Sequence, residues 1–221
     1  MTNPPDKKRI FLADDHPLVR EWLANLIHQQ PDLTVCGETE SAPTALSAVA
    51  AAQPDLVIAD INLKNSSGIE LIKNLKELHP EIPVLVLSMH DESLYAERVF
   101  RAGARGYVNK RETTQKVVEA IRRVLGGKLY VSEKAAEVLA SETIRGRTVN
   151  RSAIELLSDR ELEVFDKLGQ GIGTRQIAGE LRVGVKTVQE YCARIKEKLN
   201  LNSATELLRE AVRWHDSKNP N

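Results

Sequence analysis

The first half of the chain alternates short apolar runs with longer stretches of helical spacing, five times over. The runs are "RIFLA", "LTVCGE", "DLVIAD", "PVLVLSM" and "GYVNK", and the helical stretches cover residues 18–27, 42–52, 69–78, 93–102 and 116–125. Strands that alternate with helices in this way are typical of a parallel sheet with helices on both faces. The pattern predicts an α/β domain in the first half of the chain. If its strands follow the spatial order 2-1-3-4-5, strands 1, 3, 4 and 5 are consecutive neighbours.

The second half of the chain contains helical spacing and no convincing strand. Four helices are expected, over residues 159–169, 174–181, 185–199 and 203–215. Ser158, followed three residues later by Glu161, is the signature of a capping box at the first of them. The polar stretch "SETIRGRTVNRSA", residues 141–153, is typical of an interdomain linker. We therefore expect an all-α domain over residues 155–217, joined to the first domain by a helix and linker over 128–154.

Composition excludes several classes of protein. The 31 basic and 31 acidic residues cancel, so the chain is not a uniformly basic nucleic-acid coat. Cys36 and Cys192 lie far apart without metal-ligand spacing, which fits a reducing compartment better than a disulfide scaffold. The start "MTNPPDKKR" lacks the apolar stretch of a signal peptide, and no apolar run has the length of a membrane span. We expect a soluble, cytoplasmic protein.

Polar residues stand where the predicted strands end. Asp14 and Asp15 follow the first strand, Asp60 the third, Ser88 the fourth and Lys110 the fifth. The carboxyl ends of parallel strands meet at one edge of a sheet, so these side chains should converge. Three clustered carboxylates need raised pKa values or a cation, and oxygen ligands at this density suit Mg²⁺. A carboxylate can also attack phosphorus to give an aspartyl phosphate, and Asp60 on the central strand is best placed to do so.

Each of these residues taken alone is better explained as a turn, cap or solvated loop residue. Their joint placement at the ends of the correct strands favours a functional site. Together with "VIADIN", "LSMH" and "GYVNK", they make residues 8–127 resemble the receiver domain of two-component response regulators. The resemblance implies a flavodoxin-like (CheY-like), doubly wound five-stranded fold. It also implies phosphotransfer from a sensor histidine kinase to Asp60.

The same resemblance implies roles for the other residues of the site. Mg²⁺ would be held by Asp15, Asp60 and the backbone carbonyl of Asn62, with Asp14 acting through water. Ser88 and Lys110 would bind the phosphoryl group. Tyr107 would be an aromatic switch, although an ordinary ring at the sheet edge explains that residue equally well.

The segment "TRQIAGELRVGVKTVQEYCARIKEKLN" predicts a short helix, a tight turn and a longer helix, which is the signature of a helix-turn-helix. The apolar residues of the longer helix recur at helical spacing and are expected to be buried: Val185, Val188, Cys192, Ile195 and Leu199. Residues 175–198 contain six basic and three acidic side chains, a modest excess. This excess alone does not distinguish a DNA-binding helix from a bundle helix with a solvated charged face.

Residues 155–215 resemble the LuxR-type helix-turn-helix of NarL/FixJ-type regulators through "LSDRELEVF", "QIAGEL" and "VKTV". The resemblance implies that Lys186, Thr187 and Lys198 contact DNA phosphates. It places these residues in the major groove: Gln189, Glu190, Ala193 and Arg194. It also implies that the last helix pairs two copies through Leu208, Ala211 and Trp214, and we expect Leu207 and Val212 to face inward.

These features predict a phosphorylation-dependent transcriptional regulator that binds promoter DNA, forms a homodimer and is not an enzyme beyond its own phosphotransfer and slow autodephosphorylation. Two alternatives stay open. One is an adaptor that has lost DNA affinity, suggested by Gly184 and Tyr191, where the family often has Ser and usually has His, and by the acidic Glu190. The other is a Mg²⁺-dependent phosphohydrolase, which the short loops disfavour because no segment is inserted to form a substrate pocket.

Overall fold

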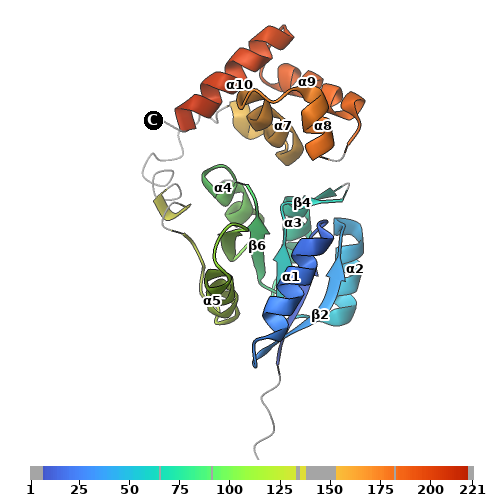
Figure 1. Ribbon diagram of the computed structural model, residues 1–221, viewed down its shortest axis with the longest axis vertical. Helices are drawn as coiled ribbons and strands as arrows, with labels where there is room; N and C mark the ends of the chain where they lie inside the picture. The colour runs from blue at the N-terminus through green and yellow to red at the C-terminus, as the bar shows by residue number, and fades with distance from the viewer. Residues whose placement is uncertain are drawn as a thin grey trace, which may run out of the picture. The chain divides into compact units, whose positions relative to one another are not determined.

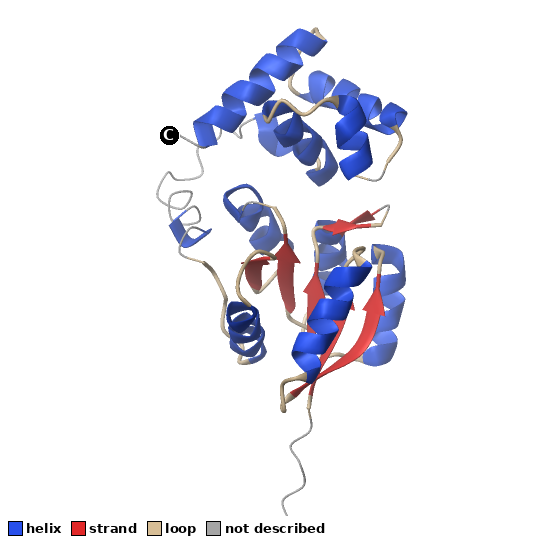
Figure 2. Cartoon of the chain, viewed as in Figure 1, coloured by secondary structure: helices blue, strands red, loops and turns tan. Residues whose placement is uncertain are grey.

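The computed structural model describes residues 7–64, 66–90, 92–132, 135–137, 153–181 and 183–218. The chain divides into two compact units, Met1–Arg147 and Thr148–Asn221, as Figures 1 and 2 show. Most of the predicted linker, residues 141–152, lies outside the described residues, as does most of the helix expected after residue 128.

The first unit is built on a five-stranded parallel sheet in the order β2-β1-β3-β6-β7, which corresponds to 2-1-3-4-5 among the predicted strands (Figure 2). The central strands β3 and β6 are buried along their whole length, which explains why they are almost continuous apolar runs in the sequence. The strands are β1 Lys8–Ala13, β2 Leu33–Thr39, β3 Leu56–Ala59, β6 Val84–Ser88 and β7 Gly106–Asn109.

Helices cover both faces of this sheet (Figure 1). One face packs against α1 and α5 in a single apolar cluster that includes Ile10, Leu23 and Ile121. The helices α2, α3 and α4 lie side by side over the other face. The sheet is therefore doubly wound, as predicted. The helices are α1 Pro17–His28, α2 Ala42–Ala52, α3 Gly68–Leu78, α4 Glu92–Ala102 and α5 Thr114–Leu125.

Two features of the first unit were not predicted. A short antiparallel hairpin, β4 Asn62–Leu63 and β5 Ser66–Ser67, follows β3 directly. After α5 the chain returns to the sheet, where Tyr130 forms a parallel bridge with Gly106 on β7. Both features lie beside strands whose ends carry the candidate site.

The second unit is entirely helical in its described part, and its helices match the predicted ones within a few residues. Ser158 and Glu161 form the expected capping box at the start of α7. Helices α7 and α10 approach closely, because a Cβ atom added at Gly169 would lie 2.5 Å from the carbonyl oxygen of Ala211. The elements are the 3₁₀ helix η1 Ala153–Leu156, then α7 Asp159–Gly169, α8 Thr174–Glu180, α9 Val185–Lys198 and α10 Ala204–Lys218.

Within the described part of the chain, no helix combines the length and the apolar character that crossing a membrane requires.

Candidate functional site

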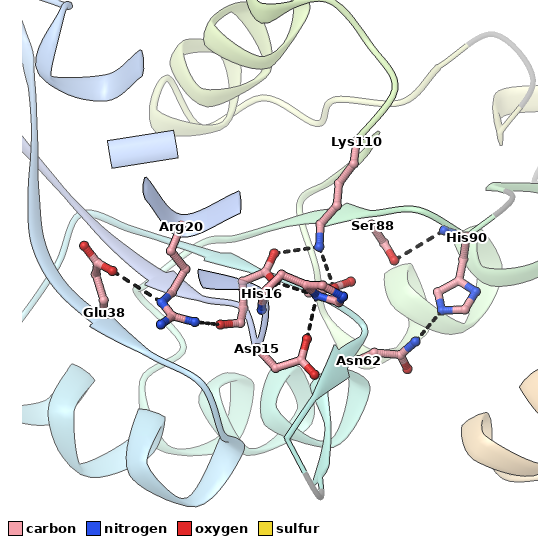
Figure 3. Close-up of polar contacts among 10 residues, drawn as sticks. Asp15, His16, Arg20, Glu38, Asn62, Ser88, His90 and Lys110 are labelled. Carbon is pink, nitrogen blue, oxygen red and sulfur yellow. Dashed lines mark hydrogen bonds and ion pairs between the residues drawn. The ribbon is translucent and has the colours of Figure 1, made fainter. Parts of the chain in front are cut away.

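The carboxyl ends of the sheet strands bring the predicted acidic and basic residues together. Lys110 Nζ lies 2.6 Å from Asp14 Oδ2 and 2.6 Å from Asp60 Oδ2. All three side chains are almost completely buried. Figure 3 shows the side chains of Lys110, Asp15 and His16 directed toward one another at this edge. The convergence expected from the strand order is confirmed, and one ammonium balances two carboxylates.

The electrostatics of this cluster keep Lys110 charged. Burial, together with the charge of Asp60, raises the pKa of Asp14, and Lys110 offsets only part of that rise. Burial alone would lower the pKa of Lys110, but the carboxylates of Asp60 and Asp14 outweigh it and raise that pKa above its ordinary value. Lys110 is therefore a permanent counter-ion of the site.

The acidic residues also form a candidate metal site. One ligand atom each from Asp14, Asp15, His16 and Asp60 can be chosen so that all lie within 4.8 Å of one another. Asp60 Oδ1 is buried and accepts no hydrogen bond from the described residues, whereas Asp15 Oδ1, which also lacks a hydrogen bond, lies 2.7 Å from Nδ1 of His16. A buried carboxylate oxygen without a partner is costly, and a hydrated Mg²⁺ would provide one. The carboxylate donor set thus fits Mg²⁺.

His16 belongs to this site and was not predicted. Its Nδ1 lies 2.7 Å from Asp15 Oδ1 and 3.2 Å from Asp14 Oδ1, and its backbone N–H donates to Asp14 Oδ1. Arg20 fixes the same turn by donating to the carbonyl oxygen of Asp14 and pairing with Glu38 at 3.4 Å. Adjacency to the acidic pair was the available signal. Imidazole is not a ligand that Mg²⁺ prefers, so we do not count His16 among the metal ligands.

Gly68 positions the loop that carries Asp60, and it too was missed. A Cβ atom at this position would lie 1.8 Å from the carbonyl oxygen of Asp60. The Gly68 N–H donates to the carbonyl oxygen of Ile61 at 2.7 Å. The backbones approach so closely that only glycine fits.

The loop after β6 joins Ser88 to the far side of the site. Ser88 is completely buried, and its Oγ accepts a long hydrogen bond from the His90 N–H at 3.5 Å. His90 Nε2 is hydrogen-bonded to Asn62 Nδ2 at 2.7 Å, as Figure 3 shows. The Tyr107 hydroxyl and the Asn109 amide both donate to the His90 carbonyl oxygen, at 2.9 and 3.1 Å. Tyr107 is completely buried on β7, the edge strand of the sheet, and its role as a switch stays a prediction.

In the second unit, α9 presents the predicted polar surface. Its exposed residues include all those expected in the major groove, and Thr187 is half-buried. Val188 and Ile195 are completely buried as predicted, and Cys192 and Leu199 are half-buried. The prediction for Val185 was wrong, because 38% of this residue is exposed. Val185 is the first residue of α9, and the residue that is buried on this face is Val188, one turn later. The exposed residues are Lys186, Gln189, Glu190, Ala193 and Arg194.

Lys198 has a partner within its own domain. Its Nζ lies 2.7 Å from Oε2 of the buried Glu161, which also accepts from the Ser158 N–H. Burial raises the pKa of Glu161, but the hydrogen bonds from Lys198 and Ser158 outweigh it and lower that pKa. The ammonium that was expected to contact a DNA phosphate therefore ties the end of α9 to the start of α7.

The expectations for α10 need correction. Ala211 is completely buried against α7, so its predicted role in pairing two copies is wrong. Val212 was expected to face inward but is 36% exposed. Trp214 is half-buried and its ring packs on Phe165 with centroids 5.4 Å apart, so it contributes to the core of the unit.

The exposure of Leu207 and of Leu208 agrees with what was expected for these two residues of α10. Leu207 is buried as predicted, and Leu208 is 46% exposed, so the role of Leu208 in pairing stays a prediction.

Comparison with known families accounts for both units. The response regulator receiver domain matches residues 10–122, and the luxR family of bacterial regulatory proteins matches residues 155–211. The chain belongs to the two-component response regulators of the NarL/FixJ type. This response regulator is a phosphorylation-dependent, DNA-binding regulator of transcription, and neither of its domains is that of a classical enzyme.

Its relatives match almost the whole response regulator. It is 36% identical to the transcriptional activator protein ExaE of Pseudomonas putida, over 92% of this chain and 95% of that protein. It is 32% identical to the oxygen regulatory protein NreC of Staphylococcus carnosus, over 93% and 97%.

Solved structures share its fold. A LuxR-family two-component response regulator from Aurantimonas sp. SI85-9A1 is 34% identical with a TM-score of 0.59, over 63% of this chain and 99% of that one. RcsB of Salmonella enterica serovar Typhimurium, bound to a promoter with a phosphomimetic, is 23% identical with a TM-score of 0.58, over 92% and 97%. The second likeness concerns the fold alone.

Proposed function

We propose that Asp60 is the phosphoacceptor and takes its phosphoryl group from the phosphohistidine of a sensor histidine kinase. The observation that carries this proposal is the asymmetry of the Asp60 carboxylate. Its Oδ2 is held by Lys110 at 2.6 Å, whereas its buried Oδ1 accepts no hydrogen bond from the described residues. One oxygen is thus fixed by a counter-ion, and the other keeps its lone pairs available for attack on phosphorus.

In the transfer, the bond between phosphorus and the kinase histidine breaks as a bond to Asp60 Oδ1 forms. Charge then builds on the phosphoryl oxygens. Lys110 balances that charge, and the Ser88 hydroxyl donates a hydrogen bond to another phosphoryl oxygen. The protein needs no general base, because the nucleophile is a carboxylate and not a hydroxyl group. Slow autodephosphorylation, by attack of water on the same phosphorus, returns Asp60 to its starting form.

Mg²⁺ is the cofactor of this site. Asp15, Asp60 and the backbone carbonyl of Asn62 would hold it, with Asp14 acting through a water molecule. When bound, it supplies positive charge that stabilises the phosphoryl oxygens. The support for this assignment is the cluster of three carboxylates around a single lysine, in which the buried Asp60 Oδ1 accepts no hydrogen bond from the described residues.

The phosphoryl group changes the output through Ser88 and Tyr107. It adds a charge of about −2 at Asp60 and draws the Ser88 hydroxyl toward it. The His90 carbonyl oxygen, two residues after Ser88, accepts from the Tyr107 hydroxyl, so the loop after β6 and strand β7 move together. This movement changes the surface formed by α4, β7 and α5, which promotes dimerisation or unmasks the helix-turn-helix.

The second unit binds promoter DNA as a homodimer. Lys186 and Thr187 contact phosphates. Lys198 does not contact DNA in this arrangement, because its ammonium is bound to Glu161. Leu208, an exposed apolar residue of α10, pairs the two copies. The response regulator works in the cytoplasm, where its promoter DNA lies. The side chains that enter the major groove are Gln189, Glu190, Ala193 and Arg194, all of them exposed.

Asp60→Asn tests the phosphoacceptor. We expect the wild-type chain to take up one phosphoryl group from acetyl phosphate with Mg²⁺, measured by intact mass, and the variant to take up none. Asp55→Asn is the matched control, because Asp55 stands at the other end of β3 and pairs with Lys8. Labelling of the Asp60 variant would place the chemistry on another residue.

The remaining alternatives make different predictions. A phosphohydrolase would turn over phosphomonoesters without accumulating phosphate on the chain. An adaptor would take up phosphate and still not bind promoter DNA, and the acidic, exposed Glu190 is the observation that favours it. A titration of the phosphorylated chain with promoter DNA at two salt concentrations separates these outcomes, because specific binding should weaken steeply with salt.

A further inference from the structure

The outer edge of β7 is covered by the chain that leads out of the first unit. We call residues 128–132 the strap. The Tyr130 N–H donates to the Arg105 carbonyl oxygen at 3.0 Å, and the Tyr107 N–H donates to the Tyr130 carbonyl oxygen at 3.2 Å. β7 is the last strand of the sheet, and an unpaired edge of this kind readily pairs with other chains. The strap closes that edge.

Gly106 on β7 leaves room for the strap. A Cβ atom at Gly106 would lie 3.0 Å from Tyr130 Cβ and 3.1 Å from the Tyr130 carbonyl oxygen. Glycine at this position therefore lets the two backbones approach. A residue of β7 thus provides the space in which Tyr130 packs.

Both ends of the strap are tied to helices, and the strap runs from α5 toward the start of α4 (Figure 1). Arg123 on α5 donates to the carbonyl oxygen of Leu129 at 2.9 Å. The Ser132 hydroxyl is hydrogen-bonded to the carboxylate of Glu92, the first residue of α4, which is buried. The Ser132 Oγ also accepts from the N–H of Ala135, which is completely buried.

Two of these ties lead to the loop after β6. Glu92 begins the helix that follows this loop. Tyr107 donates its N–H to the strap and its hydroxyl to the carbonyl oxygen of His90 within the loop. The loop follows directly on Ser88, the last residue of β6. The hydroxyl of Ser88 is expected to move toward phosphorylated Asp60. A displacement of this loop therefore disturbs two hydrogen bonds of the strap, the one with Tyr107 and the one with Glu92.

We propose that the strap is a latch that phosphorylation of Asp60 loosens. This inference rests on the proposed function, because it takes Asp60 as the phosphoacceptor. In the unphosphorylated protein the strap is seated on β7 and held at Glu92. When Ser88 shifts toward the phosphoryl group, the strap can no longer keep its hydrogen bonds to Tyr107 and to Glu92 at the same time. Residues 128–132 then leave the sheet edge, and the signal passes into the chain that connects the two units.

Hydrogen exchange of the full-length protein tests the latch. We expect exchange in a peptide covering residues 126–132 to rise at least tenfold when the chain is phosphorylated with acetyl phosphate and Mg²⁺. Exchange in a peptide from α2 should not change. The intact mass of the same samples gives the fraction that carries phosphate.

Ser132→Ala tests the tie to Glu92 without any phosphate. This variant should exchange faster at residues 126–132 than the wild type when both are unphosphorylated. The matched control is Ser47→Ala, on α2, where the hydroxyl donates only to Thr44 within its own helix. The control should exchange as the wild type does.

The outcomes separate the two proposals. Full phosphorylation with unchanged exchange at the strap overturns the latch and leaves the phosphoacceptor standing. Unchanged exchange in Ser132→Ala also overturns it, because the hydrogen bond to Glu92 would then not protect the strap from exchange. A chain that takes up no phosphate refutes the proposed function, and the latch with it.

Discussion

The ammonium of Lys110 lies 2.6 Å from Asp60 Oδ2 and neutralises the carboxylate that we expect to take the phosphate. The same nitrogen is 2.6 Å from Asp14 Oδ2, so its removal would leave two buried carboxylates without a counter-ion. Lys110→Met should therefore lower the free energy of unfolding by about 3–5 kcal/mol without divalent ions. Mg²⁺ should restore much of that loss. Chemical unfolding with and without Mg²⁺ measures both effects.

The control for this variant is Lys8→Met. Lys8 forms an exposed pair with Asp55 at 2.7 Å, and its loss should cost no more than about 1 kcal/mol with no response to Mg²⁺. An equal Mg²⁺ response in both variants would show that Lys110 does not share its carboxylates with the metal.

His90 should control how long the phosphoryl group survives. The hydrogen bond between its ring and the Asn62 amide joins the loop after β6 to the start of β4, two residues after Asp60. His90→Ala removes that bridge, so water should reach the phosphorus more easily and the phosphate half-life should fall several-fold. The decay is followed by intact mass after removal of acetyl phosphate. His28→Ala, on the exposed end of α1, is the control and should decay as the wild type does.

Gly68→Ala should be severe although the change is a single methyl group. The new Cβ would collide with the carbonyl oxygen of Asp60 at 1.8 Å, so the loop has to move. We expect a loss of about 3 kcal/mol or more in the free energy of unfolding, and slower phosphorylation of the remaining folded protein. Gly179→Ala, inside α8 with open space around it, should instead gain up to about 1 kcal/mol.

Lys186 and Lys198 should behave differently although both are basic residues of α9. Lys186→Ala should weaken binding to all DNA sequences and reduce the slope of log affinity against log salt by about 1, because one phosphate contact is lost. Lys198→Ala should leave that slope unchanged and instead destabilise the second unit, because buried Glu161 loses its partner. Fluorescence titration over a salt series and thermal unfolding distinguish the two. A fall in the salt slope for Lys198→Ala would restore its predicted phosphate contact.

Glu161 should make the second unit sensitive to acid. Its pKa in the folded protein is lowered below the ordinary value of 4.5, so the stability that it contributes is present above about 4.5. That stability is lost as the pH falls through the lower, folded pKa. The difference in stability between the wild type and Glu161→Gln should therefore shrink below about pH 4.5.

Trp214 fluorescence, in a Trp22→Phe background, reports unfolding of this unit. Glu210→Gln, which disturbs only an exposed pair with Arg213, should show no such convergence. A constant difference between the wild type and Glu161→Gln at every pH would contradict the assignment.

The sheet and the cluster at its edge could be predicted because each depends on a local pattern. Apolar runs identify strands, and parallel strands bring their last residues together, so Asp14, Asp60 and Lys110 meet whatever the details of packing. The hairpin after β3 and the strap on β7 have no such pattern. They depend on pairing of a few backbone groups, which side-chain periodicity does not encode.

Errors in the second unit arose at helix ends and at the choice of helix face. Val185 has the right spacing for the core but stands at the first position of α9. Leu207, Ala211 and Trp214 are spaced by four and three residues, which is the pattern of one buried face. That spacing predicts Ala211 in the core and Val212 on the surface. The pair of Lys198 with Glu161 joins residues 37 apart in sequence, and no local rule connects them.

The strap also sets the length of chain that can extend beyond α5. Releasing residues 128–132 frees five residues from the edge of the sheet. Fully stretched, five residues reach roughly 16–18 Å. Opening the latch would thus lengthen the reach of the chain after α5 by up to about half of the roughly 34–36 Å that separates adjacent half-sites on DNA.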